Sequence, residues 1–118
     1  MAYKISDSEW KIMEIIWEKG AVPQSDIMDA LNGKWNKNTV YTFLSRLEQK
    51  GLVAAEGTPK EYRAAVSRGD CVAQEEENFL NKIYHGSAGK MVTAFLQEGR
   101  LSADEVEELK KLLEGMDV

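Results

Sequence analysis

Hydrophobic positions recur at helical spacing along most of this chain, and two short stretches alternate instead. Apolar residues three and four positions apart predict α-helices, whereas alternation predicts β-strands. The helical spacing predicts helices over residues 7–19, 24–31, 37–49, 70–84 and 88–97, and a last helix that begins after Ser102. The alternation predicts strands over residues 52–56 and 61–66, with a very short strand at 21–22. The predicted order is therefore helix, short strand, two helices, β-hairpin and three further helices.

Several of these helices begin with recognisable capping signals. Ser6 is followed three residues later by Glu9, and Ser102 by Glu105. Both pairs match the capping box, in which each side chain bonds the other residue's backbone N–H. The segment 57–60 contains glycine and proline between two strand patterns, and we expect it to form the tip of the hairpin.

The third predicted helix, which follows the N-cap Asn36, has two distinct faces. Its apolar face repeats at positions i, i+3, i+4 and i+7, through Val40, Phe43, Leu44 and Leu47. Its opposite face has the same spacing in hydrogen-bonding residues, namely Asn38, Tyr41, Thr42 and Ser45. An α-helix fits the major groove of DNA, where asparagine can pair with adenine and threonine can contact a thymine methyl group. This helix therefore has the pattern expected of a recognition helix.

The order of elements predicts a mainly α fold with a small β-hairpin wing, a winged helix-turn-helix followed by a C-terminal helical dimerisation region. We assign residues 1–69 to the DNA-binding domain and residues 70–118 to a three-helix dimerisation region. The expected DNA-binding residues of the recognition helix are Lys37, Asn38, Thr39, Tyr41, Thr42, Ser45, Arg46 and Lys50. On the wing, Lys60 and Arg63 are expected to hold phosphates.

The charge is unevenly distributed along the chain. The net charge of −5 would argue against a nucleic-acid partner if it were spread evenly. Residues 1–70 are balanced, with ten basic and ten acidic side chains, so the whole acidic excess lies in residues 71–118. Residues 34–68 carry seven basic and three acidic side chains. A local basic surface, rather than the global charge, attracts phosphate, although ordinary solvated side chains would give the same count.

The C-terminal segment has apolar stripes on three short helices. About 40 residues is close to the lower size limit for a domain that folds alone without disulfides or metals. Two copies packed around a two-fold axis would bury the stripes and present two recognition helices to a palindromic operator. The alternative is that these helices fold back on their own winged domain. The expected dimerisation residues are Phe79, Leu80, Ile83, Met91, Val92, Phe95, Leu96, Leu109 and Leu113.

Other chemistry has little support in the sequence. Cys71 and His85 are the only residues of their types, whereas a structural metal site needs about four ligands. There is no glycine-rich phosphate loop or nucleophile motif, so we expect neither an enzyme nor a cofactor. No apolar run approaches the roughly 18 residues of a membrane span, and the first residues, MAYKISDSEW, lack the apolar region of a secretory signal. A cytoplasmic protein without a membrane partner is therefore expected.

Five segments, in order along nearly the whole chain, resemble the penicillinase-repressor family of BlaI, MecI and CopY. ISDSEWKIMEIIW resembles the family's first helix, and WNKNTVYTFLSRLEQKGLV resembles its recognition helix and first wing strand. EGTPKEYRAAVS is similar to the wing, and NFLNKIYHGS and LSADEVEELKKLL resemble the dimerisation helices. The resemblance implies a homodimeric transcriptional repressor of resistance or stress genes that binds short inverted repeats.

The resemblance leaves the inducing signal open. In the β-lactam branch of the family, a membrane sensor-protease cuts an Asn-Phe pair in the dimerisation region, but this chain has Ala94-Phe95 at the matching place. The copper branch ends in a cysteine-rich metal motif, whereas this sequence ends EGMDV. The missing asparagine argues against the proteolytic route, and the missing motif gives copper sensing no support. An inducing sensor or protease stays among the candidate partners, but the sequence does not identify it.

Two alternative functions are compatible with parts of the sequence. One is a winged-helix protein-interaction module that has lost DNA binding, although such modules usually expose apolar anchors rather than an amide and hydroxyl face. The other is a redox or metal sensor that acts through Cys71 or His85. Asp70 and Glu75 near Cys71 would raise the pKa of the thiol and lower its reactivity.

Overall fold

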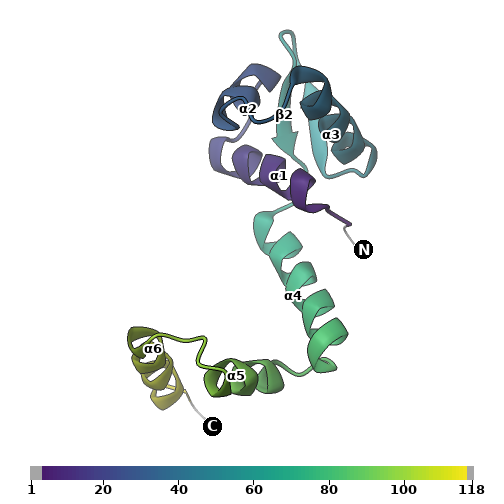
Figure 1. The fold of residues 1–118 in the computed structure, drawn as a ribbon. Helices are drawn as coiled ribbons and strands as arrows, with labels where there is room; N and C mark the ends of the chain where they lie inside the picture. The colour runs from purple at the N-terminus through teal and green to yellow at the C-terminus, as the bar shows by residue number, and fades with distance from the viewer. Residues whose placement is uncertain (1–3, 117–118) are drawn as a thin grey trace. The chain divides into compact units, whose positions relative to one another are not determined.

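The computed structural model describes residues 4–116, which form two compact units that divide between Glu75 and Glu76. Unit 1 is the part before this point and unit 2 the part after it. The chain is mainly helical with one antiparallel hairpin, as the sequence pattern predicts (Figure 1). The elements are α1 (Asp7–Lys19), α2 (Gln24–Ala30), α3 (Lys37–Gln49), β1 (Val53–Glu56), β2 (Glu61–Ala64), α4 (Arg68–Tyr84), α5 (Ala88–Gln97) and α6 (Ala103–Glu114).

The first turns of the helices form as the capping signals predict. Ser6 and Glu9 form the capping box of α1, and Ser102 and Glu105 form that of α6. The exception in position is α4, which begins two residues before the predicted start. The Ser67 hydroxyl accepts a hydrogen bond from the backbone N–H of Asp70 at 3.1 Å. This contact satisfies a donor in the first turn, so the helix begins directly after Ser67.

The hairpin is joined to the rest of unit 1 by a single extra pairing. Val22 and Tyr62 form an isolated antiparallel bridge, with N···O distances of 2.9 and 2.7 Å in the two directions. In Figure 1 the tip of the hairpin extends beyond α2 and α3. The register of the two strands pairs Val53 with Ala64, Ala54 with Arg63, Ala55 with Tyr62, and Glu56 with Glu61.

Unit 1 contains one hydrophobic core, built from α1, α2, α3 and the hairpin. The indole Nε1–H of Trp17 donates to the Val66 carbonyl at 3.0 Å and ties α1 to the segment after β2. Arg68 also pairs with Glu14 at 2.6 Å, which joins α1 to the first turn of α4. The core side chains are Ile12, Met13, Ile16, Val22, Ile27, Leu31, Val40, Leu44, Leu47, Leu52, Val53 and Tyr62.

Unit 2 has no comparable core. None of the described residues 76–116 is buried, although many of them are large and apolar. The ring of Tyr84 lies 5.9 Å from that of Phe79 and 6.3 Å from that of Phe95, measured between centroids. The exposed large apolar residues of this unit are Phe79, Ile83, Leu96, Leu112, Leu113 and Met116. In residues 4–116 no helix has both the length and the hydropathy needed to cross a bilayer.

Candidate nucleic-acid interface

The α3 helix separates its apolar and polar residues onto opposite faces. Val40, Leu44 and Leu47 are completely inaccessible to solvent in the core of unit 1. Phe43 is half-buried, and its ring lies 5.4 Å from that of Trp35. On the opposite face, three of the four predicted base-facing residues are exposed and Ser45 is half-buried; the exposed ones are Asn38, Tyr41 and Thr42.

Two polar contacts fix the beginning of α3. The side chain of Asn36 accepts a hydrogen bond from the Thr39 backbone N–H at 2.8 Å, which makes it the predicted N-cap. The Gln24 side-chain amide donates to the Lys37 carbonyl at 3.0 Å and so joins the first residue of α2 to the first residue of α3. The capping of α3 was predictable from Asn36, whereas the contact from Gln24 was not.

The exposed face of α3 still has free hydrogen-bonding capacity. The Thr42 hydroxyl donates to the Asn38 carbonyl at 2.9 Å. This bond uses the only hydroxyl proton but leaves the oxygen lone pairs and the methyl group available. Tyr41 is 52% exposed, although tyrosine usually buries its ring. The surface therefore offers an amide, a phenol, a methyl group and hydroxyl acceptors from one rigid helix.

The side chains predicted to bind phosphates differ in the contacts that they make within the protein. Arg63 on the hairpin pairs with Glu56 at 2.8 Å, and both side chains are more than half exposed. The Arg46 guanidinium lies 5.7 Å from the Phe43 ring, and the Lys60 ammonium lies 5.4 Å from the Tyr62 ring. Within the part of the chain that the structure describes, no ion pair involves Lys34, Lys37, Arg46 or Lys60.

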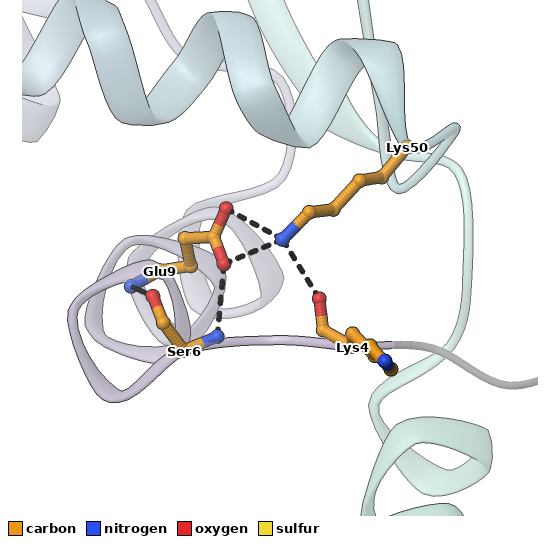
Figure 2. Close-up of polar contacts among 4 residues, drawn as sticks. All are labelled: Lys4, Ser6, Glu9 and Lys50. Carbon is orange, nitrogen blue, oxygen red and sulfur yellow. Dashed lines mark hydrogen bonds and ion pairs between the residues drawn. The ribbon is translucent and has the colours of Figure 1, made fainter.

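Lys50, at the C-cap of α3, lies in a cluster that the sequence did not predict. Its ammonium donates to both carboxylate oxygens of Glu9, at 2.8 and 2.9 Å, and to the Lys4 carbonyl at 2.8 Å (Figure 2). The Glu9 carboxylate also accepts the backbone N–H of Ser6 at 2.8 Å. Glu9 is only 2% exposed and is the one buried charged residue among residues 4–116. No pattern in the sequence pairs positions 9 and 50, because the capping box already explains a glutamate at position 9.

The cluster shifts the acidity of Glu9. Burial alone would raise the pKa of its carboxyl group. The hydrogen bonds from Lys50 and Ser6 and the positive charge of Lys50 outweigh burial, so the pKa of Glu9 lies below its ordinary value. The carboxylate is therefore ionised at neutral pH and holds the lysine ammonium in place.

The residues of the proposed redox or metal sensor are not brought into a reactive site. Cys71 is 2% exposed, and burial together with the charge of Asp70 raises the pKa of its thiol. A buried thiol with a raised pKa is a poor nucleophile. His85 is exposed, directly after α4. Within residues 4–116, no group of three or more histidine, cysteine or acidic side chains is arranged to hold a metal ion.

Comparison with known protein families decides the assignment. Residues 5–115 match the penicillinase repressor family. The chain belongs to this family. Members of the penicillinase repressor family are DNA-binding transcriptional repressors rather than enzymes, which confirms the DNA-binding repressor predicted from the sequence.

Two relatives in this repressor family align with this chain over nearly the full length of both proteins. The methicillin resistance regulatory protein MecI of Mammaliicoccus sciuri is 33% identical over 115 residues, which is 94% of each chain. The penicillinase repressor of Bacillus licheniformis is 31% identical over 115 residues, covering 94% of this chain and 90% of that protein.

A solved structure supports the fold of this penicillinase repressor family member. It is Bordetella bronchiseptica BpsR, whose DNA binding is regulated by 6-hydroxynicotinic acid. The two chains share 18% identity and align with a TM-score of 0.50, over 95% of this chain and 75% of the other. At this identity the likeness concerns the winged-helix fold alone.

Proposed function

We propose that this protein represses transcription by binding a palindromic operator as a homodimer, with α3 in the major groove. The main observation is the division of α3 into two faces. Its aliphatic side chains are fully inaccessible in unit 1, while Asn38, Tyr41 and Thr42 project into solvent. A major-groove helix needs this arrangement, since base edges are read by donors, acceptors and methyl contacts.

The remaining contacts are proposed from charge and position. Asn38, Tyr41, Thr42 and Ser45 would face the bases. Lysine and arginine side chains on α3 and the hairpin would bind phosphates, which orient a protein on DNA without reading sequence. The proposed phosphate-contacting residues are Lys37, Arg46, Lys60 and Arg63, together with Thr39. We leave out Lys50, because its ammonium already donates three hydrogen bonds inside the protein.

Dimerisation through unit 2 is supported by the apolar surface that this unit leaves uncovered. Phe79 and Ile83 on α4 are 44% and 49% exposed, and Leu113 on α6 is 58% exposed. Monomeric proteins rarely expose large apolar patches, whereas a second copy would remove this surface from water. We keep the boundary proposed from the sequence, with DNA binding in residues 1–69 and dimerisation in residues 70–118, although residues 70–75 belong to unit 1. The proposed dimer contacts are Phe79, Leu80, Ile83, Met91, Val92, Phe95, Leu96, Leu109 and Leu113.

The proposal is tested by measuring DNA affinity against salt. The wild-type protein would first select duplexes from a randomised pool, and the enriched sequence would be compared with a random duplex of the same length. We expect a preference for an inverted repeat and a steep linear fall of log K with log salt, as for about 6–10 phosphate contacts per dimer. If no sequence is enriched and affinity equals that for random DNA, the proposal is wrong and an interaction module is favoured.

A further inference from the structure

We propose that Glu9 and Lys50 are positioning residues that set the position of α3 along its own axis, which we call its register. They would thereby determine DNA specificity without contacting DNA. The inference rests on the proposed placement of α3 in the groove. It concerns a buried cluster on the protein side of the helix rather than the surface that faces the bases.

The apolar contacts of α3 restrain its register through packing, and the polar contacts at its ends add directional restraints. Hydrophobic burial is non-directional, because it depends on the apolar area that is removed from water. Val40, Leu44 and Leu47 pack in the core and hold α3 against unit 1. A hydrogen bond, in contrast, weakens steeply when its distance or angle departs from a narrow range. The polar contacts at the two ends of α3 therefore add a directional restraint on the position of the helix in unit 1.

Such contacts occur at both ends of α3. At its first residue, the Gln24 amide donates to the Lys37 carbonyl at 3.0 Å. At its C-cap, the Lys50 ammonium donates to Glu9 and to the Lys4 carbonyl, all at 2.9 Å or less (Figure 2). The second contact is the stronger one, since charge-assisted hydrogen bonds are roughly twice as strong as neutral ones.

The position of Glu9 makes this second contact a link to the rest of unit 1. The Glu9 side chain is part of the α1 capping box, so it is held by the Ser6 backbone N–H at 2.8 Å. Because Glu9 is 2% exposed, water competes little for its carboxylate. The Lys50–Glu9 contact therefore fixes the end of α3 relative to the beginning of α1, and its loss would release one end of α3.

A shift of α3 would affect specific binding more than non-specific binding. The side chains proposed to read bases lie on the same rigid 13-residue helix, so they would move together. Base-edge hydrogen bonds require donor–acceptor distances of about 2.7–3.2 Å. Phosphate contacts by long lysine side chains adapt more easily, and they carry no sequence information. A fall in the ratio of specific to non-specific affinity would therefore indicate that α3 has shifted.

Two single variants separate this role from a direct phosphate contact by Lys50. Glu9→Gln keeps the capping box, which accepts glutamine, and removes no positive charge. Lys50→Met removes the ammonium and keeps an apolar stem of similar length. A double variant, Glu9→Gln with Lys50→Met, removes both charges without leaving one of them uncompensated. Glu18→Gln and Lys19→Met, both at exposed positions of α1, are the matched controls for the change of charge.

The measurement is the affinity of each variant for the duplex selected by the wild-type protein and for a random duplex. Circular dichroism would fix a temperature at which each protein is fully folded. A positioning role predicts that Glu9→Gln, Lys50→Met and the double variant each lose about tenfold in specific affinity. Their affinity for random DNA and the salt slope stay at the values of the controls. The double variant keeps the test valid if a single variant does not fold.

Two other results would overturn the inference. A direct phosphate contact by Lys50 predicts that Lys50→Met loses specific and random affinity equally, with a salt slope lower by about one per subunit. Glu9→Gln would then bind as tightly as its control. A purely structural role predicts lower stability but an unchanged ratio in all three variants. Failure of the proposed function is distinguishable, because the wild-type protein itself would then show no preference for any sequence.

Discussion

At the scale of single residues, the carboxylate of Glu9 accepts hydrogen bonds from two parts of unit 1. It caps α1 through the Ser6 backbone N–H, and it binds the Lys50 ammonium at the end of α3. Removal of one partner of a buried ion pair leaves the other charge without compensation. The pair is thus a weak point as well as a contact between helices.

The stability contributed by Glu9 should depend on pH. We expect Glu9→Gln to lower the free energy of unfolding by about 1.5–3 kcal/mol at neutral pH, the range for a hydrogen bond to a charged group. The pKa of Glu9 is lowered in the folded protein. The contribution is therefore full above the ordinary glutamate pKa and disappears as the pH falls through the folded pKa. Urea unfolding of both proteins from about pH 7 to about pH 3 measures the difference.

A matched control for this experiment is Glu18→Gln, because Glu18 is exposed at the end of the same helix. Its effect should be small, as for most exposed charges. A gap between wild type and Glu9→Gln that stays constant into strong acid would contradict the assigned role of the carboxylate.

Residues that face bases and residues that face phosphates should respond differently to truncation. Thr42→Ala removes a methyl group and hydroxyl from the exposed face of α3, so we expect it to weaken specific binding more than random binding. Lys60→Ala should weaken both alike and reduce the salt slope by about one per subunit. Titration of both variants at several salt concentrations checks this difference. Equal losses for Thr42→Ala on the two duplexes would remove its assignment as a base-reading residue.

At the scale of elements, local capping defines where α3 begins. The Asn36 side chain accepts the Thr39 N–H at 2.8 Å, and no residue in the first turn carries a negative charge. A first turn without acidic residues keeps a favourable region for a phosphate, since the N-terminus of a helix carries partial positive charge.

Truncation of this cap should be costly, and serine should restore it. Asn36→Ala is expected to lower the free energy of unfolding by about 1 kcal/mol, because the Thr39 N–H loses its partner. Asn36→Ser should retain most of the stability, since serine is an equally good N-cap. Urea unfolding followed by circular dichroism compares the three proteins. Equal stability of the alanine and serine variants would show that the cap contributes nothing.

The elements themselves were predictable because their signals are local. The starts of α1 and α3 follow from Ser6 and Asn36, and Ser87 caps α5 in the same way; each side chain accepts a backbone N–H three residues later. The start of α4 was wrong by two residues, because Ser67 caps it and Gly69 is tolerated in its first turn. The hairpin strands are shorter than predicted, at Val53–Glu56 and Glu61–Ala64. The Leu52 N–H donates to the Leu47 carbonyl at 2.9 Å, although the Leu52 carbonyl still accepts the Ala65 N–H at 2.9 Å.

At the scale of the whole molecule, the two units differ in how they bury apolar side chains. Unit 1 completes its own core, whereas unit 2 leaves its apolar stripes half-buried or exposed. All three tryptophans, Trp10, Trp17 and Trp35, lie in unit 1. Tryptophan fluorescence therefore reports on the winged helix separately from the proposed dimerisation helices.

This separation allows a direct test of dimerisation. Ile83 is 49% exposed in the single chain, so Ile83→Asp should not disturb a monomer. In a dimer, the new carboxylate would be buried without a partner at a cost of several kcal/mol. We expect light scattering to show a dimer for the wild-type protein and dissociation for Ile83→Asp, with unchanged tryptophan fluorescence. Asn78→Asp adds the same charge at an exposed polar position of α4 and should remain a dimer.

A wild-type protein that is monomeric at micromolar concentration would contradict the homodimer. Dimers of both variants would instead show that unit 2 associates through a surface that excludes Ile83.

The candidate site was predictable only in part. The two faces of α3 follow from a spacing within 13 residues, so one sequence suffices to place them. The Glu9–Lys50 contact joins residues 41 positions apart and exists only once the chain has folded. The ion pair between Arg63 and Glu56 was likewise not predictable from the sequence, because it depends on the register of the hairpin.

The two-faced construction of α3 has a practical consequence for protein engineering. Within residues 4–116, the side chains at positions 38, 41, 42 and 45 make one hydrogen bond, from Thr42 to its own helix, and three of the four are exposed, so new side chains there should largely preserve folding. Asn36 caps the helix, the Gln24 amide binds the backbone carbonyl of Lys37, and Lys50 binds Glu9, so the side chains of Asn36, Gln24 and Lys50 would have to be kept. A library randomised only at these four positions could therefore redirect the protein to new operators. Every member would keep the contacts that hold α3 in unit 1.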